Sequence, residues 1–198
     1  HMIRVVPPSV ASPAFSESSE RPNSPSYVLA LGHLETRKNI ATLIRASGEE
    51  SWPAGLELWI AGRDNGALNT LRLLAETAGG SIRFLGPVDE VQKWELLRWA
   101  QIVAVPSELE GFGIVAVEGP LAGSVTLVSD RTALPELAGH PLAIVDCYDY
   151  REWARRIAFL TANPRISREI LKAQQTLASR FTGDFLGPLM NEIYSSLA

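Results

Sequence analysis

Apolar runs of strand length alternate with helical segments along most of this chain. Helical segments at 39–47, 68–78 and 89–100 separate the runs; in the second, Leu71, Leu74 and Ala78 share one face. Strands without polar alternation, separated by helices, are typical of a parallel sheet covered on both faces. The pattern predicts an α/β fold, a doubly wound and Rossmann-like parallel sheet. Its strands are expected at 26–32, 56–62, 81–86, 101–107, 125–130 and 142–146.

The two ends of the chain differ from this central pattern. Residues 9–25 are rich in Ser, Pro and Glu and hold little to bury, and the first two residues look like the scar of a cleaved tag. Residues 149–198 are helical by pattern, and Asn163-Pro164 and Gly183 divide them into three helices. We therefore expect a tag scar and interdomain linker at 1–25, a Rossmann-like domain at 26–182 and a C-terminal helix at 183–198.

Composition narrows the function classes. The 198 residues carry a net charge of −4, which argues against nucleic acid as a partner because a basic face is needed to displace counterions from phosphates. The single cysteine, Cys147, cannot form an internal disulfide, and this suits a cytoplasmic location. No apolar run approaches the length of a transmembrane segment, so we expect none.

Candidate chemistry is concentrated in the stretch PSELEGFGIVAVEGPLAG, which follows the fourth predicted strand. Ligands of open parallel sheets bind beyond the carboxyl ends of the strands. Gly111 and Gly113 would let the backbone approach a ligand, and the free amides opening a helix near Ile114 would favour phosphate oxygens. Glu118 could accept hydrogen bonds from ribose hydroxyls, and Glu110 from sugar hydroxyls. On spacing alone, two solvated glutamates explain the pattern equally well.

Several motifs in this order are similar to those of one known family. They are GHLETRKN, IRFLGPV, PSELEGFGIVAVE and SDRTALPELAG, preceded by IRVVPPSV. Together they resemble the C-terminal, donor-binding half of a family-4 retaining glycosyltransferase of the GT-B fold, in the group named glycosyl transferases group 1. The resemblance covers nearly all of the chain. It implies that residues 26–182 bind a nucleotide sugar and that 183–198 would pack toward a missing N-terminal domain.

The resemblance also assigns roles residue by residue. Lys38 matches the lysine that neutralises the donor diphosphate, and Glu118 matches the ribose ligand. Glu110 takes the catalytic position, where it orients the donor and stabilises charge. Phe112 could equally be a core plug that anchors its loop. Backbone amides complete the implied site: Gly111, Phe112 and Gly113 at the hexose, and Ile114 and Val115 at the diphosphate.

The chain departs from the family pattern at two places. His33 stands where many relatives carry an arginine, so the second diphosphate cation is Arg37, a protonated His33 or absent, with Arg37 preferred. Gly119-Pro120 lies within the predicted helix, and proline removes an internal hydrogen bond, so we expect a kink or an early helix end there. The position of Glu118 relative to the rest of the site depends on how the helix continues at these two residues.

Other polar residues have two readings. Arg63, Asp64 and Asn65 follow the second predicted strand and could reach the hexose or form a turn cap.

No carboxylate or histidine cluster suits a metal ion, and the resemblance implies a metal-independent site without a cofactor. Lys38, an arginine and helix amides would then balance the diphosphate charge.

The function implied is transfer of a hexose from a nucleotide-diphosphate sugar with retention of configuration. The motif GHLETRKN slightly favours GDP-mannose, and UDP-sugars stay open. The acceptor, a saccharide or lipid, would contact the missing N-terminal domain, so this chain should bind the donor but turn over little. Peripheral attachment of the whole protein at the inner face of a membrane stays open. The alternatives are an epimerase-like enzyme acting on a nucleotide sugar and a non-catalytic nucleotide-binding domain.

Overall fold

The computed structural model describes residues 6–11 and 24–195, so most of the linker predicted at 1–25 lies outside the described residues. Its centre is a six-stranded, fully parallel sheet in the order β3-β2-β1-β4-β5-β6. The predicted α/β, Rossmann-like sheet is confirmed. The strands are β1 (Tyr27–Leu31), β2 (Glu57–Ala61), β3 (Ile82–Gly86), β4 (Ile102–Val105), β5 (Thr126–Ser129) and β6 (Ile144–Val145).

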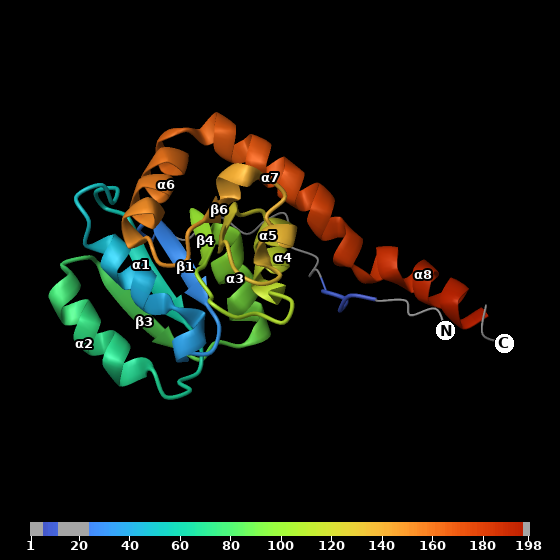
Figure 1. The fold of residues 1–198 in the computed structure, drawn as a ribbon, viewed down its shortest axis with the longest axis horizontal. Coiled ribbons are helices and arrows are strands. Elements are labelled where there is room, and N and C mark those ends of the chain that lie inside the picture. Colours follow the sequence, from blue (N-terminus) through green and yellow to red (C-terminus); the bar gives the residue numbers. More distant parts are fainter. Residues whose placement is uncertain (1–5, 12–23, 196–198) are drawn as a thin grey trace.

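Helices connect successive strands and cover both faces of the sheet. α1 packs against α2 and α6, whereas α4 packs against α3 and α7 (Figure 1). The α-helices are α1 (Ile40–Ser47), α2 (Leu68–Ala78), α3 (Glu90–Trp99), α4 (Ile114–Ala122), α5 (Leu134–Leu137), α6 (Tyr150–Ala162), α7 (Pro164–Ala178) and α8 (Gly183–Ser195). Short 3-10 turns are η1 (Thr36–Lys38), η2 (Pro141–Ala143) and η3 (Ser179–Phe181).

The core lies where the sequence lacks polar alternation. Every residue of β4 and β5 is buried, as expected for central strands covered on both faces. The last strand differs from its prediction at 142–146. Its first residues form η2, in which the amide of Leu142 donates to the His140 ring, and only Ile144–Val145 pair with β5. Pro141 fits the start of this turn because its position needs no amide donor.

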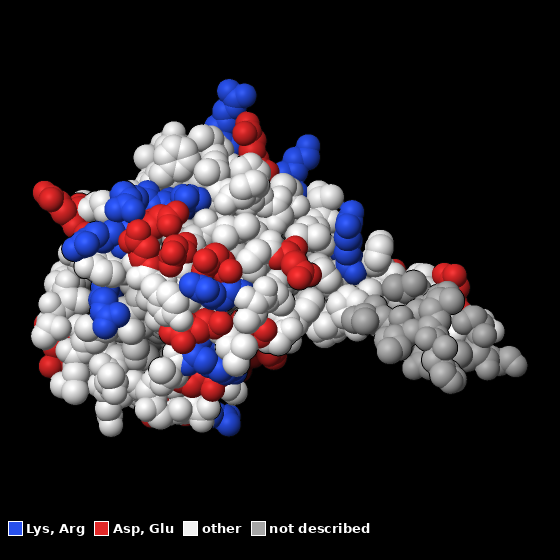
Figure 2. All heavy atoms as spheres, viewed as in Figure 1, with Lys and Arg blue, Asp and Glu red and all other residues white. Residues whose placement is uncertain are grey.

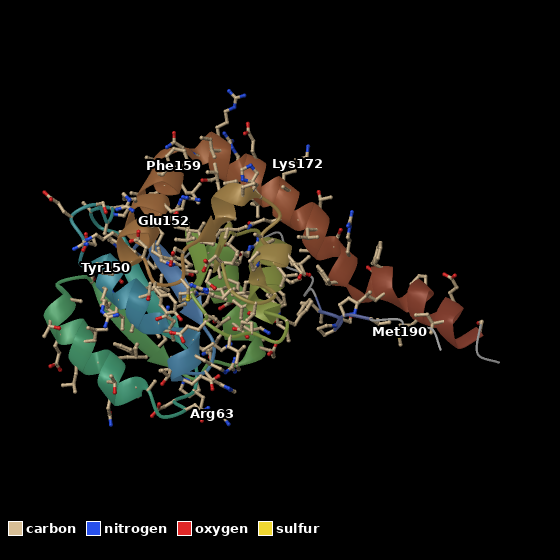
Figure 3. The ribbon with its side chains drawn as sticks, in the orientation of Figure 1. Arg63, Tyr150, Glu152, Phe159, Lys172 and Met190 are labelled. Atoms are coloured by element: carbon tan, nitrogen blue, oxygen red, sulfur yellow. The ribbon has the colours of Figure 1, made fainter. Side chains whose placement is uncertain are left out.

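The C-terminal part forms the three predicted helices. α8 extends away from the sheet beyond α7, and Met190 lies on this projecting segment (Figures 1 and 3). At its base, Val10 forms an isolated bridge with Thr182, and the Val10 amide donates to the Phe181 carbonyl at 2.7 Å. The segment before the sheet domain therefore meets the chain directly before α8.

Pro120 acts as expected on α4. The helix ends two residues later at Ala122, and Gly123 closes it in the left-handed conformation. Gly119 is needed for close approach, since a Cβ there would lie 2.2 Å from the Thr126 hydroxyl oxygen on β5. α4 thus lies tightly against the sheet, and this contact fixes the position of Glu118 relative to the sheet.

Charges are intermixed on the face shown in Figure 2, where acidic and basic side chains alternate. Opposite charges also pair within helices, as Arg156 and Glu152 do on α6 at 2.9 Å. Within residues 6–11 and 24–195, no helix is both long and apolar enough to cross a membrane.

Candidate functional site

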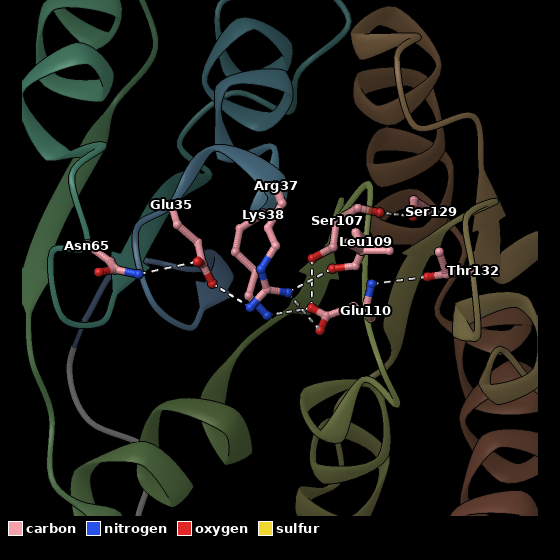
Figure 4. A network of polar contacts seen from close by, with 9 residues as sticks. All are labelled: Glu35, Arg37, Lys38, Asn65, Ser107, Leu109, Glu110, Ser129 and Thr132. Carbon is pink, nitrogen blue, oxygen red and sulfur yellow. Dashed lines mark hydrogen bonds and ion pairs between the residues drawn. The ribbon is translucent and has the colours of Figure 1, made fainter.

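The candidate site lies at the carboxyl edge of the sheet, where β1 and β4 are neighbours. Strand order reverses at this point, and the loops after β1 and β4 leave side by side. The Glu108 amide donates to the Arg37 carbonyl at 2.8 Å and joins the two loops directly. Residues far apart in sequence therefore face one another here (Figure 4).

Glu110 is the centre of a polar cluster. Its Oε1 lies 2.5 Å from Lys38 Nζ and accepts a hydrogen bond from Ser107 Oγ at 2.9 Å. Its Oε2 lies 3.7 Å from Arg37 NH1. The Glu110 side chain is only 10% exposed, and these contacts hold its carboxylate in a fixed orientation. The predicted Lys38 and Glu110 are thus brought together.

Arg37 is held on the rim of this cluster. Its guanidinium donates to the Leu109 carbonyl at 2.8 Å and to Glu35 Oε1 at 2.6 Å. Asn65, which follows β2, donates to the other Glu35 oxygen at 3.3 Å. The Arg37 side chain is still 42% exposed, so a ligand can reach this cation. Glu35 was not singled out from the sequence.

The two glycines of the loop, Gly111 and Gly113, differ in whether a side chain could be accommodated at their positions. Gly113 caps α4 with φ +93°, and a Cβ there would lie 2.6 Å from a methyl group of Leu134, so both backbone and packing require glycine. Gly111 faces open space instead. In the described part of the chain, the amides of Gly111 through Val115 have no hydrogen-bond acceptor. These donors are free for a ligand.

The Phe112 side chain packs into the protein. Its ring meets the ring of Phe181 edge-on, with centroids 5.2 Å apart. It also packs against the main hydrophobic core. The side chain therefore anchors the loop, as the core-plug reading anticipates, while its amide stays available.

Glu118 lies in the second turn of α4 and is 5% exposed. Its Oε1 is 2.7 Å from Lys93 Nζ on α3, and Lys93 also pairs with Glu90 at 2.7 Å. Burial alone would lower the pKa of Lys93, but the bonds to Glu118 and Glu90 outweigh it and raise that pKa. Lys93 was not singled out from the sequence, because nothing along the chain places it opposite α4.

A pocket of about 330 Å³ opens between these elements. Backbone and side chains from the loops after β1, β2 and β3 form one wall, and α3 and α4 form the other. Val115 and His33 line it, so His33 stands near Glu118, whereas Arg37 stands near Glu110. A second pocket, of about 360 Å³, shares Pro87 and Val88 with the first and is lined largely by aromatic and aliphatic side chains.

Asp64 forms a turn cap. Its Oδ1 accepts hydrogen bonds from the amides of Gly66, Ala67 and Leu68 at 2.9 to 3.1 Å. The Leu68 bond is the main cause that lowers the pKa of Asp64. The Asp64 carboxylate is thus engaged by the backbone amides at the start of α2. Arg63 lines the pocket.

No metal cluster is present in the described ranges: nowhere do three or more His, Cys, Asp and Glu side chains gather. Sequence reasoning found the residues on the two principal loops. It missed Glu35, Lys93 and Ser107, and also Thr132, whose hydroxyl accepts from the Glu110 amide. Ser107 lies inside the PSELEGFG motif, and its place in that motif is the feature of the sequence that could have identified it as a site residue.

Solved structures with this architecture are GT-B glycosyltransferases. The sucrose-phosphate synthase of Thermosynechococcus elongatus superposes with a TM-score of 0.78 at 24% identity, over 89% of this chain and 46% of that one. Anabaena HepE in complex with UDP-glucose gives a TM-score of 0.76 at 23% identity, over 86% of this chain and 48% of that one. The fold is therefore the Rossmann-like fold found in these GT-B structures.

The chain belongs to the family "Glycosyl transferases group 1", whose model matches residues 12–176. The D-inositol 3-phosphate glycosyltransferase of Corynebacterium jeikeium (strain K411) is 29% identical over 98% of this chain and 52% of that protein. The phosphatidyl-myo-inositol mannosyltransferase of Mycolicibacterium smegmatis is 37% identical over 57% of this chain and 29% of that protein. The chain thus spans about half the length of the first of these relatives.

Proposed function

We propose that this chain is the donor-binding half of a retaining, family-4 glycosyltransferase, and that it holds a hexose linked to a nucleoside diphosphate. The observation that carries the proposal is the Lys38–Glu110 pair, 2.5 Å apart, beside five free amides at the switch point of the sheet. A cation and helix amides suit a diphosphate, and a fixed carboxylate suits sugar hydroxyls.

The donor would extend along the edge of the sheet. Its ribose hydroxyls bind Glu118, and its base lies near Gly86 to Val88. The diphosphate lies between Lys38 and the amides of Ile114 and Val115. The hexose then reaches Glu110 and the amides of Gly111 to Gly113. This order is supported by the pocket that Val115 and Glu118 line together, and by the cluster that joins Lys38 to Glu110.

The chemistry required of these residues is electrostatic. In the transfer step, the bond from the anomeric carbon to the diphosphate oxygen breaks, a bond to an acceptor hydroxyl oxygen forms, and the proton of that hydroxyl passes to the leaving diphosphate. Negative charge develops on the leaving diphosphate, where Lys38 and the α4 amides would stabilise it without a metal ion or cofactor. Glu110 would orient the hexose and stabilise positive charge at its anomeric carbon.

Names of similar proteins support the donor class. HepE was solved with UDP and with UDP-glucose, and the Mycolicibacterium relative is named a mannosyltransferase. We propose a UDP- or GDP-linked hexose accordingly, with mannose a specific candidate. Acceptor binding is assigned to a further N-terminal domain, toward which α8 would pack, with the whole protein in the cytoplasm or at the inner face of a membrane. By itself, this chain would bind donor and transfer little.

Calorimetry with UDP, GDP, UDP-glucose and GDP-mannose tests the proposal. We expect saturable binding of at least one nucleotide, and a loss of about tenfold or more in Lys38→Met, because a charge-assisted contact to the diphosphate is removed. Lys172→Met, on α7, is the matched control. Absence of heat with all four ligands, or unchanged affinity in Lys38→Met, would contradict the proposed site.

A further inference from the structure

Thr132 adopts a backbone conformation that is unusual for its type. Its φ is +50°, and among the described residues only one other non-glycine residue, Asn39, has positive φ. A β-branched side chain in the left-handed region is a genuine outlier, because its Cβ crowds the backbone. Such strain persists only where surrounding structure fixes it, and it clusters at functional sites.

Thr132 lies at the exposed edge of the site, next to the backbone of Glu110. Its hydroxyl oxygen accepts a hydrogen bond from the Glu110 amide at 3.1 Å. Ser129, the last residue of β5, makes a second contact with the same segment, in which its Oγ donates to the Ser107 carbonyl at 2.5 Å. The end of β5 and the loop that follows it thus hold the two ends of the segment from Ser107 to Glu110 (Figure 4).

Glu110 is therefore fixed in two independent ways. Lys38 and Ser107 hold its carboxylate, and Thr132 holds its backbone. The next residue, Gly111, has no side chain with which to anchor the loop. Without the Thr132 contact, the carboxylate could stay paired while the amides from Gly111 onward move relative to it.

We propose that Thr132 is a positioning residue for the hexose subsite, acting through the backbone of Glu110. The inference rests on the proposed function, because it takes the Glu110 loop to hold the sugar of the donor. It assigns Thr132 no contact with the nucleotide. A glycine at this position would remove both the strain and the hydroxyl. The threonine therefore lowers the stability of the fold through its strain, and its hydroxyl holds the loop in place.

Three substitutions distinguish the effect of the Thr132 hydroxyl from the effect of the backbone strain at this residue. Thr132→Val keeps the β-branch and loses the hydroxyl, Thr132→Ser keeps the hydroxyl, and Thr132→Gly removes both. Thr77→Val is the matched control, since Thr77 is an exposed threonine on α2 whose hydroxyl donates to the Leu74 carbonyl of its own helix. Should Thr132→Val fail to fold, Thr132→Ala replaces it.

The measurement is the affinity of the whole chain for a nucleoside diphosphate and for the corresponding nucleotide hexose. In Thr132→Val we expect diphosphate affinity within about twofold of wild type and hexose-donor affinity about three- to tenfold lower, as for loss of one hydrogen bond. Thr132→Ser and Thr77→Val should match wild type with both ligands. Thr132→Gly should show the same selective loss together with a higher melting temperature.

Two results would overturn the inference. One is hexose-donor affinity unchanged in Thr132→Val. The other is an equal loss for diphosphate and hexose donor, which would show a general structural role. A wild-type chain that binds neither ligand would instead overturn the proposed function, and this inference with it, so the two failures are distinguishable.

Discussion

Lys93 Nζ and Glu118 Oε1 lie 2.7 Å apart and join the first turn of α3 to the second turn of α4. The two side chains are 17% and 7% exposed, so the pair is shielded from screening by solvent. The carboxylate proposed to hold ribose is thus held in place by a lysine 25 residues away.

Glu118→Gln should weaken binding of UDP and GDP by about tenfold, because hydrogen bonds to a charged acceptor are the stronger kind. Glu90→Gln is the control, since Glu90 pairs with the same lysine but its side chain is 79% exposed. It should bind as wild type does. Calorimetry measures both, and equal affinity of the two variants would contradict the ribose assignment.

Gly113→Ala should destabilise the domain by about 2 kcal/mol or more, since alanine at φ +93° is strained and its Cβ would clash with Leu134. Gly111→Ala should unfold near the wild-type denaturant midpoint, because Gly111 faces open space. It should nevertheless weaken hexose-donor binding, as the new methyl group would stand where the ligand approaches. A stable Gly113→Ala variant would show that the loop adapts.

Asp64 should contribute stability that depends on pH in the acid range. Its folded pKa is lowered below 3.8, mainly by the Leu68 amide, so its contribution is present above pH 3.8 and is lost as pH falls through the folded value. Asp64→Ala should therefore melt lower than wild type at pH 7. The difference should shrink steadily below pH 3.8. A constant difference across this range would rule out the charged cap as its cause.

Cys147 should resist thiol reagents in the native protein. It is fully buried, its Sγ donates to the Pro106 carbonyl at 3.3 Å, and burial raises the pKa of its thiol. At pH 8, labelling should be on the order of a hundredfold slower than in denaturant, because it requires opening of the structure. Asn39→Ala should label faster, since Asn39 donates to both the Cys147 carbonyl and its sulfur. Rapid labelling of the native chain would contradict this packing.

Much of the fold was accessible from local patterns. The helix predicted at 68–78 is α2 as observed, and the helix predicted at 89–100 is α3, at Glu90–Trp99. The strand predicted at 142–146 was too long, because Pro141 and the His140 ring stabilise a turn in its first half. An apolar run alone does not distinguish a short strand from the turn that leads into it.

The sequence by itself determined the parallel α/β architecture, the two loops that carry Lys38 and Glu110, and the early end of the helix after Pro120. These follow from periodicity, from glycine and proline, and from motifs within one segment. Only the tertiary structure decided the partners: Lys93 for Glu118, Thr132 for the Glu110 amide and Phe181 for Phe112. Each pair joins separate elements, and its distance is set by strand order and helix packing, which leave no periodic signal along the chain.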